Sequence, residues 1–238
     1  LRWAWAEPKD VITMLGSEST TYDIPNHQAE HVVQVRESRV CAWRGVSTSY
    51  TKFAVESFID ELAEHRGVDP MDYRLQLCHN NPRMIDLLNE LKSMSNWGEA
   101  DIPEGRARGL AVSGYGRSLS AGIVELSLEE STGKITVHKV WAVADSGQII
   151  SPKNSNAQLE GNLIFGLSSV LKERITIEGG VVQQANYNTY PILRMSEVPE
   201  LDCKVLITDN PPSGVGETGL AMLGPAIANG LASLTGKR

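Results

Sequence analysis

The sequence predicts an α+β fold, in which mixed layers of β-hairpins or sheet pack with helices. Helical patterns with the 3.6-residue period follow one another between residues 51 and 94. From residue 109 onward the pattern changes to β-rich segments joined by turn residues, with further helical patterns among them. This change of period excludes a four-helix bundle.

The start of the chain is expected to be an extended lead-in followed by a strand. Residues 1–30 show little periodicity and contain Pro8 and Pro25. The stretch "HVVQVRESRVCAW" (31–43) alternates enough to predict a strand or a hairpin. No basic segment followed by an apolar one is visible at the N-terminus, and the chain starts without Met, so we expect a segment or a processed product of something longer.

Three helices are predicted next. The clearest is "TKFAVESFIDELAEHRG" (51–67), where acids lie opposite the apolar face and Gly67 ends the helix. Its apolar residues at helical spacing are Phe53, Ala54, Phe58, Ile59 and Leu62. The segments 69–78 and 81–94 each begin with a capping residue followed by proline at the first helical position.

Strands and two helices are predicted after the polar link 95–109. The β-rich segments are 109–116, 121–130, 134–147 and 202–209, and "ESTGK" (130–134) suits a hairpin turn. A second hairpin is expected over 174–187 around Gly179 and Gly180. Long helical patterns cover 151–173 and, at the C-terminus, 221–236.

Composition narrows the class of function. The net charge of -7 and the lack of a basic stripe argue against nucleic-acid binding. The apolar runs fall short of the about 20 residues that span a bilayer. The scattered cysteines favour isolated thiols. The histidines are scattered as well, so no metal-ligating residues are predicted. These residues are Cys41, Cys78 and Cys203, with His27, His31, His65, His79 and His138.

The first candidate site is "SGVGETG" (213–219), where Glu217 lies between glycines and an apolar helix. Gly214, Gly216 and Gly219 permit a positive φ and close approach of the backbone to another group. Such a turn can present a carboxylate rigidly to a cavity, where burial would favour a base near neutral pH. The alternative is that Glu217 only caps the helix that follows.

Two further stretches are candidates. Arg44 follows Trp43 ahead of a polar loop, so its guanidinium could clamp an oxygen or a carboxylate; it could also stack on Trp43 or pair at the surface. Gln158, Gly161 and Ser168 lie along one predicted helix, where Gly161 would admit a close neighbour. The alternative there is a helix-packing glycine with solvated polar neighbours.

Taken in order, these stretches resemble the C-terminal part of the molybdenum-binding subunit of the xanthine dehydrogenase/aldehyde oxidase family of molybdenum hydroxylases. They are most similar to the branch that contains the β-subunit of isoquinoline 1-oxidoreductase. The likeness runs through the following stretches: "TTYDIPNHQAEHV", "AWRGVSTSYTKFAVESFIDELA", "DPMDYRLQL", "PEGRARGLAV", "VWAVADSGQIISPKNSNAQLEGNLIFGLS", "NYNTYPILRMSEVPE" and "GVGETGLAMLGPAIANGLASLTGKR". The ordered set is far more specific than any single motif.

The resemblance implies a hydroxylase whose molybdenum is held by a pterin dithiolene, often the molybdopterin cytosine dinucleotide in bacteria. Glu217 matches the family's general base, which acts on a metal-bound hydroxyl while hydride passes to a sulfido ligand. Arg44 matches the substrate-pocket Arg that follows an aromatic residue, here Trp43. Gln158 and the neighbouring Gly161 match the cofactor-facing helix, and Gly214, Val215 and Gly216 supply backbone near the metal. The "VSTSY" after Gly45 departs from the purine-oxidising branch and puts purine specificity in doubt.

The resemblance also implies missing parts. Residues 1–98, with the pocket Arg, and residues 99–238, with the cofactor-facing helix and the Glu turn, would be two segments of one incomplete molybdenum-binding unit. The expected partners are an N-terminal half or separate subunit that completes the molybdenum site, a small [2Fe-2S] subunit, and a flavoprotein or cytochrome c as acceptor. The substrate would be a small N-heterocycle or aldehyde. The protein itself is expected to be soluble, in the bacterial cytoplasm or periplasm.

Two other classes of function are weighed against this one. The chain could be a noncatalytic scaffold or assembly subunit that keeps the fold, which elemental analysis for molybdenum would reveal. A carboxylate-based hydrolase that uses Glu217 alone is weaker, because no second suitably placed acid is identified from the sequence.

Overall fold

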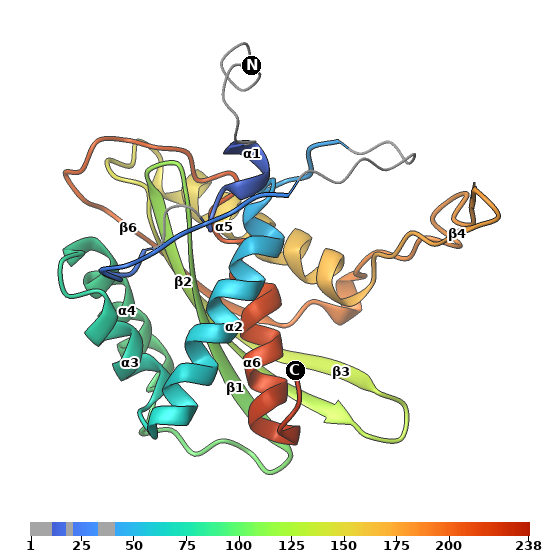
Figure 1. The fold of residues 1–238 in the computed structure, drawn as a ribbon, viewed down its shortest axis with the longest axis horizontal. Helices are drawn as coiled ribbons and strands as arrows, with labels where there is room; N and C mark the ends of the chain where they lie inside the picture. The colour runs from blue at the N-terminus through green and yellow to red at the C-terminus, as the bar shows by residue number, and fades with distance from the viewer. Residues whose placement is uncertain (1–10, 18–20, 33–40) are drawn as a thin grey trace.

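A four-stranded sheet lies between two layers of helices in the computed structural model, which describes residues 11–17, 21–32 and 41–238 (Figure 1). The strand order is β1-β2-β3-β6. β1 (Arg106–Tyr115), β2 (Ser118–Glu129) and β3 (Lys134–Asp145) form an antiparallel meander, and β6 (Glu200–Leu206) pairs with β3 in parallel. The predicted α+β class is therefore confirmed.

Each face of the sheet has its own apolar core. One face packs against α2 (Thr48–Arg66), α3 (Pro70–Leu77) and α4 (Pro82–Ser95). The other packs against α5 (Pro152–Leu171) and α6 (Leu223–Thr235). Alternate residues of β1 serve the two cores, since Leu110 and Val112 face the first helix group and Ala111 faces the second.

The contact between β1 and α6 depends on a glycine. A Cβ at Gly109 would lie 2.0 Å from the carbonyl oxygen of Ala226 and 2.3 Å from the nitrogen of Gly230. Only glycine lets the helix backbone approach the strand so closely. α6 is thereby held against β1 and beside α2, where Figure 1 shows the two helices next to each other.

The predicted elements are found with small shifts at their ends. Asp69 and Asn81 cap α3 and α4 as expected, and Gly67 ends α2 with a φ of 64°. The second hairpin is present as β4 (Ile177–Glu178) and β5 (Val181–Val182), and it stands away from the main sheet in Figure 1. A short 3-10 turn, η1 (Met195–Glu197), precedes β6.

Two predictions for the start of the chain need comment. The lead-in was expected to be extended, but the structure has a short helix, α1 (Val11–Met14). The strand predicted over 31–43 falls largely on residues 33–40, which lie outside the described residues. Its described ends, 31–32 and 41–43, are not in a strand.

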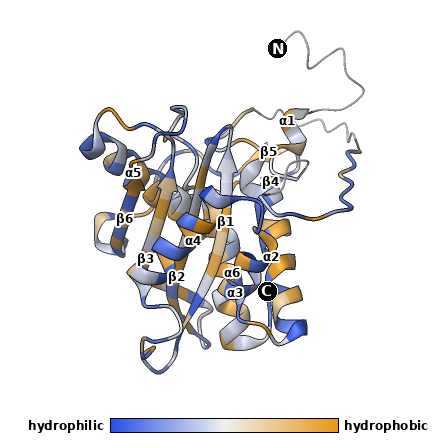
Figure 2. Cartoon of the chain, turned by 90° about the vertical axis from the view of Figure 1, so that its left-hand side faces the viewer, coloured by the Kyte–Doolittle hydropathy of each residue, from blue (hydrophilic) through white to orange (hydrophobic). Residues whose placement is uncertain are grey.

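Only part of the apolar face predicted for α2 is buried: Ile59 lies in the core, but the two phenylalanines do not. Phe53 and Phe58 are 45% and 58% exposed, whereas Lys52, Glu56 and Asp60 are buried. Figure 2 shows α2 at the edge of the molecule with orange, hydrophobic segments along it. The physical reason is the guanidinium of Arg74, which is fully buried in α3. It donates to Glu56 Oε2 at 3.1 Å and to Asp60 Oδ1 at 3.2 Å, so both acids are neutralised inside the fold.

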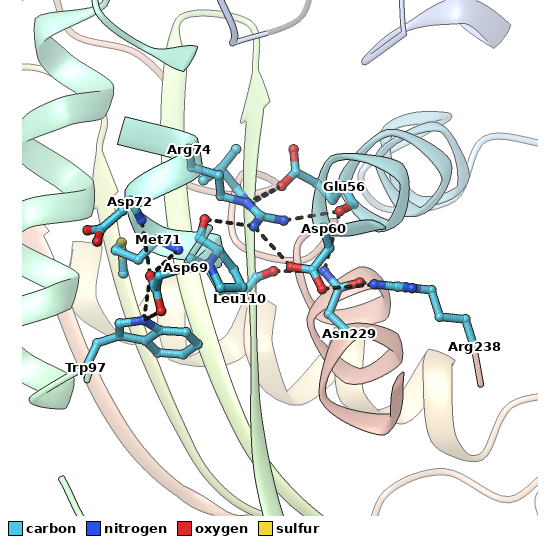
Figure 3. A network of polar contacts seen from close by, with 12 residues as sticks. Glu56, Asp60, Asp69, Met71, Asp72, Arg74, Trp97, Leu110, Asn229 and Arg238 are labelled. Carbon is cyan, nitrogen blue, oxygen red and sulfur yellow. Dashed lines mark hydrogen bonds and ion pairs between the residues drawn. The ribbon is translucent and has the colours of Figure 1, made fainter. Parts of the chain in front are cut away.

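A wider polar network surrounds this ion pair (Figure 3). Glu56 also accepts the Tyr22 hydroxyl at 2.8 Å and the Val112 N–H at 3.1 Å. Asp60 accepts Arg238 Nη2 at 2.9 Å, and Asn229 of α6 donates to the carbonyl of Leu110 at 3.0 Å. The network joins the helix layer, the sheet and the C-terminal helix, so it fixes α2 and the loop that leads into it.

In the part of the chain that the structure describes, no helix combines the length and the apolarity that crossing a bilayer demands.

Candidate active site

One guanidinium joins three of the predicted site segments. Arg44 Nε donates to the carbonyl oxygen of Gly216 at 2.7 Å. Its Nη1 and Nη2 lie 3.4 Å from the carbonyl of Gly161 and from Oε1 of Gln158, respectively. Arg44 lies on the loop before α2. It therefore meets residues of α5 and of the turn before α6 that are more than a hundred positions away from it in the sequence.

Arg44 has neutral partners at this point. Its guanidinium also lies over the ring of Phe165 at 5.4 Å from the centroid, and the Trp43 ring packs on the same Phe165 at 5.3 Å. The alternatives of stacking on Trp43 or pairing at the surface are therefore wrong, because the ring under Arg44 is Phe165. Among the described residues Arg44 has no carboxylate partner within salt-bridge distance, which leaves a positive charge at the site.

The turn after Arg44 is strained. Gly45 has a φ of 83°, and a Cβ there would lie 3.0 Å from Leu220 Cδ2. Val46 follows with a φ of 48°, which is unfavourable for a β-branched residue. Such strain is tolerated where surrounding contacts hold the backbone, and it is common at functional sites. Here it points the N–H of Gly45 at Glu217.

Glu217 is held on two sides. Its Oε1 accepts the Gly45 N–H at 3.1 Å, and its side chain is half-buried. Tyr115, at the end of β1, lies on another side: burial raises the pKa of the Tyr115 phenol, and the charge of Glu217 and a hydrogen bond to it raise that pKa further. Tyr115 therefore stays protonated beside the carboxylate.

Glu217 does not cap a helix. α6 begins at Leu223 with Met222 as its N-cap and no side-chain capping bond. The helix predicted from residue 221 thus starts later, and Glu217 lies in the preceding turn. The capping alternative is wrong because the chain makes a further turn between Glu217 and the helix.

The glycines of the turn act differently from the expectation. None of Gly214, Gly216 and Gly219 has a positive φ. A Cβ at Gly219 would lie 2.7 Å from Leu159 Cδ1, so this glycine allows close packing on α5. At Gly214 and Gly216 an added Cβ would meet nothing within 4 Å, and the same holds for Gly161, where a close neighbour was expected.

Four hydrogen bonds from three elements fix the turn. Ser118 Oγ donates to the Gly214 carbonyl at 2.6 Å, and Ser120 Oγ donates to the Thr218 carbonyl at 2.7 Å. Asn162 Nδ2 on α5 donates to the Val215 carbonyl at 2.8 Å. The N–H of Ser213 donates to the Ser146 carbonyl at 2.8 Å. The backbone around Glu217 is therefore rigid because the sheet and α5 both bind it.

Asp145 anchors the chain on its way to this turn. It is buried at the end of β3 and accepts Arg83 Nε at 2.6 Å, the Gly147 N–H at 2.8 Å and the Thr208 hydroxyl at 3.2 Å. Burial alone would raise the pKa of Asp145, but these hydrogen bonds and the charge of Arg83 outweigh it and lower the pKa. Asp145 therefore stays ionised and ties the loop after β6 to the end of β3.

The surfaces left open fit an acceptor-rich cofactor. The backbone at Gly161, Gly214 and Gly216 faces free space, as a close-lying ligand requires. Gln158 accepts Arg44 through Oε1, which leaves its amide N–H groups as donors. Within the described ranges no group of three or more His, Cys, Asp or Glu could hold a metal directly. The predicted Ser168 is buried instead, where it accepts the Leu193 N–H.

Sequence reasoning missed Tyr115 and Phe165. The sequence predicts only a strand for the segment that contains Tyr115 and only a helix for the segment that contains Phe165. No local sequence pattern marks either residue, because each one matters through a contact, with Glu217 or with Arg44, that only the fold creates.

Comparison with known proteins identifies the family of this chain. Residues 89–199 match the model of the molybdopterin cofactor-binding domain. The chain is 37% identical over 218 residues to the beta subunit of isoquinoline 1-oxidoreductase from Brevundimonas diminuta, covering 91% of this chain and 28% of that relative. It is 32% identical over 254 residues to a nicotinate dehydrogenase subunit from Pseudomonas putida, covering 98% of this chain and 21% of that relative.

The fold is similar to that of a solved structure. Quinoline 2-oxidoreductase from Pseudomonas putida 86 superposes with a TM-score of 0.70 at 12% identity, over 82% of this chain and 50% of that chain. At this identity the likeness concerns the fold alone. The chain thus spans between 21% and 28% of the length of the two curated relatives.

Proposed function

Because this chain belongs to the molybdopterin-binding subunits of the xanthine dehydrogenase/aldehyde oxidase family, we propose that it forms part of the molybdenum site of an oxidoreductase. The enzyme hydroxylates an N-heteroaromatic carbon or an aldehyde with oxygen from water. The observation that carries this proposal is the meeting of Arg44, Gln158 and Glu217 around backbone that faces open space.

The chain's own residues take distinct parts in the proposed reaction. The molybdenum-pterin cofactor, in the cytosine dinucleotide form, supplies activated oxygen from water and accepts two electrons. Glu217 removes a proton, and the N–H of Gly45 and the Tyr115 hydroxyl hold its carboxylate in place. Arg44, which has only neutral partners, stabilises negative charge that develops on the substrate.

Other residues bind the cofactor in this proposal. The Gln158 amide donates to it, and Gly161, Gly214, Val215 and Gly216 let it approach the backbone, with Trp43 as a side wall. Electrons leave through [2Fe-2S] clusters on a partner subunit. Residues 1–98 and 99–238 act together as one part of the cofactor-binding unit.

The test is elemental and pterin analysis of the assembled enzyme, purified through a tag on this chain. We expect molybdenum and pterin in amounts equal to this chain, and iron from the cluster subunit. A complex that lacks both molybdenum and pterin would instead identify the chain as a noncatalytic scaffold. A panel of N-heterocycles and aldehydes, assayed on the same preparation, identifies the substrate class.

The exposed face of α2 supports the proposal that further protein packs beside the site. Tyr50, Phe53 and Phe58 on α2 are between 45% and 58% exposed, and Trp43, which precedes the helix, is 47% exposed. Large apolar surfaces of this kind commonly mark protein interfaces. Because the relatives are several times longer than this chain, we propose that the other half of the molybdenum subunit, or a separate subunit, covers this face.

The substitution Phe58→Glu tests this interface. A charge in a desolvated contact should lower the amount of partner that copurifies with this chain by about tenfold or more. Lys134→Glu, at the exposed start of β3 and away from α2, is the control and should copurify normally. Partner recovery is measured by quantitative mass spectrometry after purification through the tag. Equal recovery with Phe58→Glu would exclude this face as the interface.

A further inference from the structure

A second polar cavity lies beside the candidate site. It has a volume of about 270 Å³ and is enclosed by the lead-in, the start of α2, the N-cap of α4 and the turn between β1 and β2. Its polar lining side chains are Thr21, Thr48, Lys52, Asn81 and Tyr115. Among the described residues no acid lines it, although the chain as a whole is acidic.

Lys52 is the unusual residue of this cavity. It is 1% exposed, and within the described part of the chain its Nζ has no hydrogen-bond partner. Burial lowers the pKa of Lys52, while the charge of Glu56 opposes that shift. An ammonium group that is removed from water and has no partner is strongly unfavourable.

The neighbouring carboxylates are already occupied. Glu56 binds Arg74 at 3.1 Å, and Asp60 is shared by Arg74 at 3.2 Å and Arg238 at 2.9 Å. Neither acid makes an ion pair or a hydrogen bond with Lys52 Nζ. Lys52 Nζ therefore makes no direct contact with either acid, although the nearby charge of Glu56 favours its protonated form.

A second donor is also free. The hydroxyl oxygen of Thr21 is buried and makes no hydrogen bond in the described ranges. Buried polar groups without partners commonly mark a missing ligand or ion. An ammonium and a hydroxyl that share a cavity, with no acid among its described lining residues, form a donor set suited to the oxygens of an anion.

We propose that this cavity is an oxyanion site, in which Lys52 is the counter-ion and Thr21 a further donor for one carboxylate or phosphate group. The volume exceeds the about 30 Å³ of a single water several times, so such a group fits. Tyr115 forms one wall, and its hydroxyl is engaged with Glu217. The anion therefore lies one side chain away from the proposed base.

Two sources of the anion share this chemistry: a free anion such as phosphate, or the carboxylate of a substrate. The first arm of the test measures binding of radiolabelled inorganic phosphate and acetate to the assembled enzyme by equilibrium dialysis, with no substrate present. We expect one saturable site per chain in the wild type. Lys52→Met should weaken binding by about tenfold or more, because a charged hydrogen bond is lost. Lys134→Met, which changes an exposed lysine at the start of β3, should bind as the wild type does.

The second arm identifies a substrate carboxylate. If the site binds part of the substrate, Lys52→Met raises KM for a carboxylated heterocycle by about tenfold and leaves KM for its uncharged parent unchanged. This arm rests on the proposed function, whereas dialysis needs neither molybdenum nor turnover. Failure of the enzyme assay alone would therefore leave the anion site supported by dialysis.

A labelling experiment on the wild type covers the case in which Lys52→Met does not fold. Phosphate or acetate should slow the acylation of Lys52 by an amine-reactive ester, relative to Lys134, as read by peptide mass spectrometry. The proposal is overturned if neither anion binds saturably and neither protects Lys52, together with an unchanged KM for carboxylated substrates. Equal anion binding by the wild type and Lys52→Met would overturn it as well.

Discussion

Glu217→Gln should lower kcat of the assembled enzyme by about 10²- to 10⁴-fold, the range lost when a general base is removed. The amide keeps an oxygen that can accept the Gly45 N–H, now 3.1 Å from Glu217 Oε1, so the turn should keep its shape. Proton removal is lost because an amide is not a base at neutral pH. The measurement is steady-state kinetics, with molybdenum and pterin determined on the same samples.

The matched control is Glu160→Gln, which changes an exposed carboxylate on α5 close in sequence to Gln158. It should keep nearly full turnover. If Glu217→Gln retains turnover within a few-fold of the wild type while its cofactor content is intact, Glu217 is not the base. If cofactor content falls with the activity, the residue binds the cofactor, and the kinetic loss no longer reports on proton transfer.

The roles of neighbouring residues follow from how rigidly the turn is held. Serines of β2 and Asn162 of α5 bind the backbone on both sides of Glu217. A base that must stay within hydrogen-bond reach of one reacting group gains from such a fixed position. These hydrogen bonds thus hold the proposed base in position, although none of the side chains that make them touches the reacting atoms.

Local sequence patterns were sufficient for most helices and strands, because the strands are β-rich segments bounded by turn residues and the helices have proline or glycine at their ends. They were misleading for α2. The spacing of Phe53 and Phe58 predicts a buried apolar face, yet the buried face carries Glu56 and Asp60. An acid is stable there only because Arg74 comes from another helix, and no local pattern shows that partner.

Resemblance located Arg44, Gln158 and Glu217, and the fold brings these three residues together. It could not locate Tyr115 or Lys52. Both positions look ordinary in the sequence, one at the end of a predicted strand and one within a predicted helix. Their significance is electrostatic and depends on which charges the tertiary structure leaves uncompensated.

Arg74→Met should lower the free energy of local opening of α2 by about 3 to 5 kcal/mol, which is the cost of leaving buried charges without a partner. Glu56 would keep only the Tyr22 and Val112 donors, and Asp60 would keep Arg238. In the assembled enzyme this corresponds to amide hydrogen exchange in α2 that is about 10²- to 4 × 10³-fold faster. Peptide mass spectrometry measures it. Arg66→Met, an exposed arginine at the end of the same helix, should leave exchange unchanged.

A variant that also removes the charges of Glu56 and Asp60 distinguishes the electrostatic role of Arg74 from the packing of its side chain. The triple variant Arg74→Met, Glu56→Gln and Asp60→Asn buries no unpaired carboxylate, so its exchange should be closer to that of the wild type than the exchange of Arg74→Met alone. Equal or faster exchange in the triple variant would mean that α2 is held mainly by the contacts of the Arg74 side chain. Slower exchange would show that neutralised acids, rather than an apolar face, decide which side of α2 is buried, which leaves Phe53 and Phe58 free for a partner.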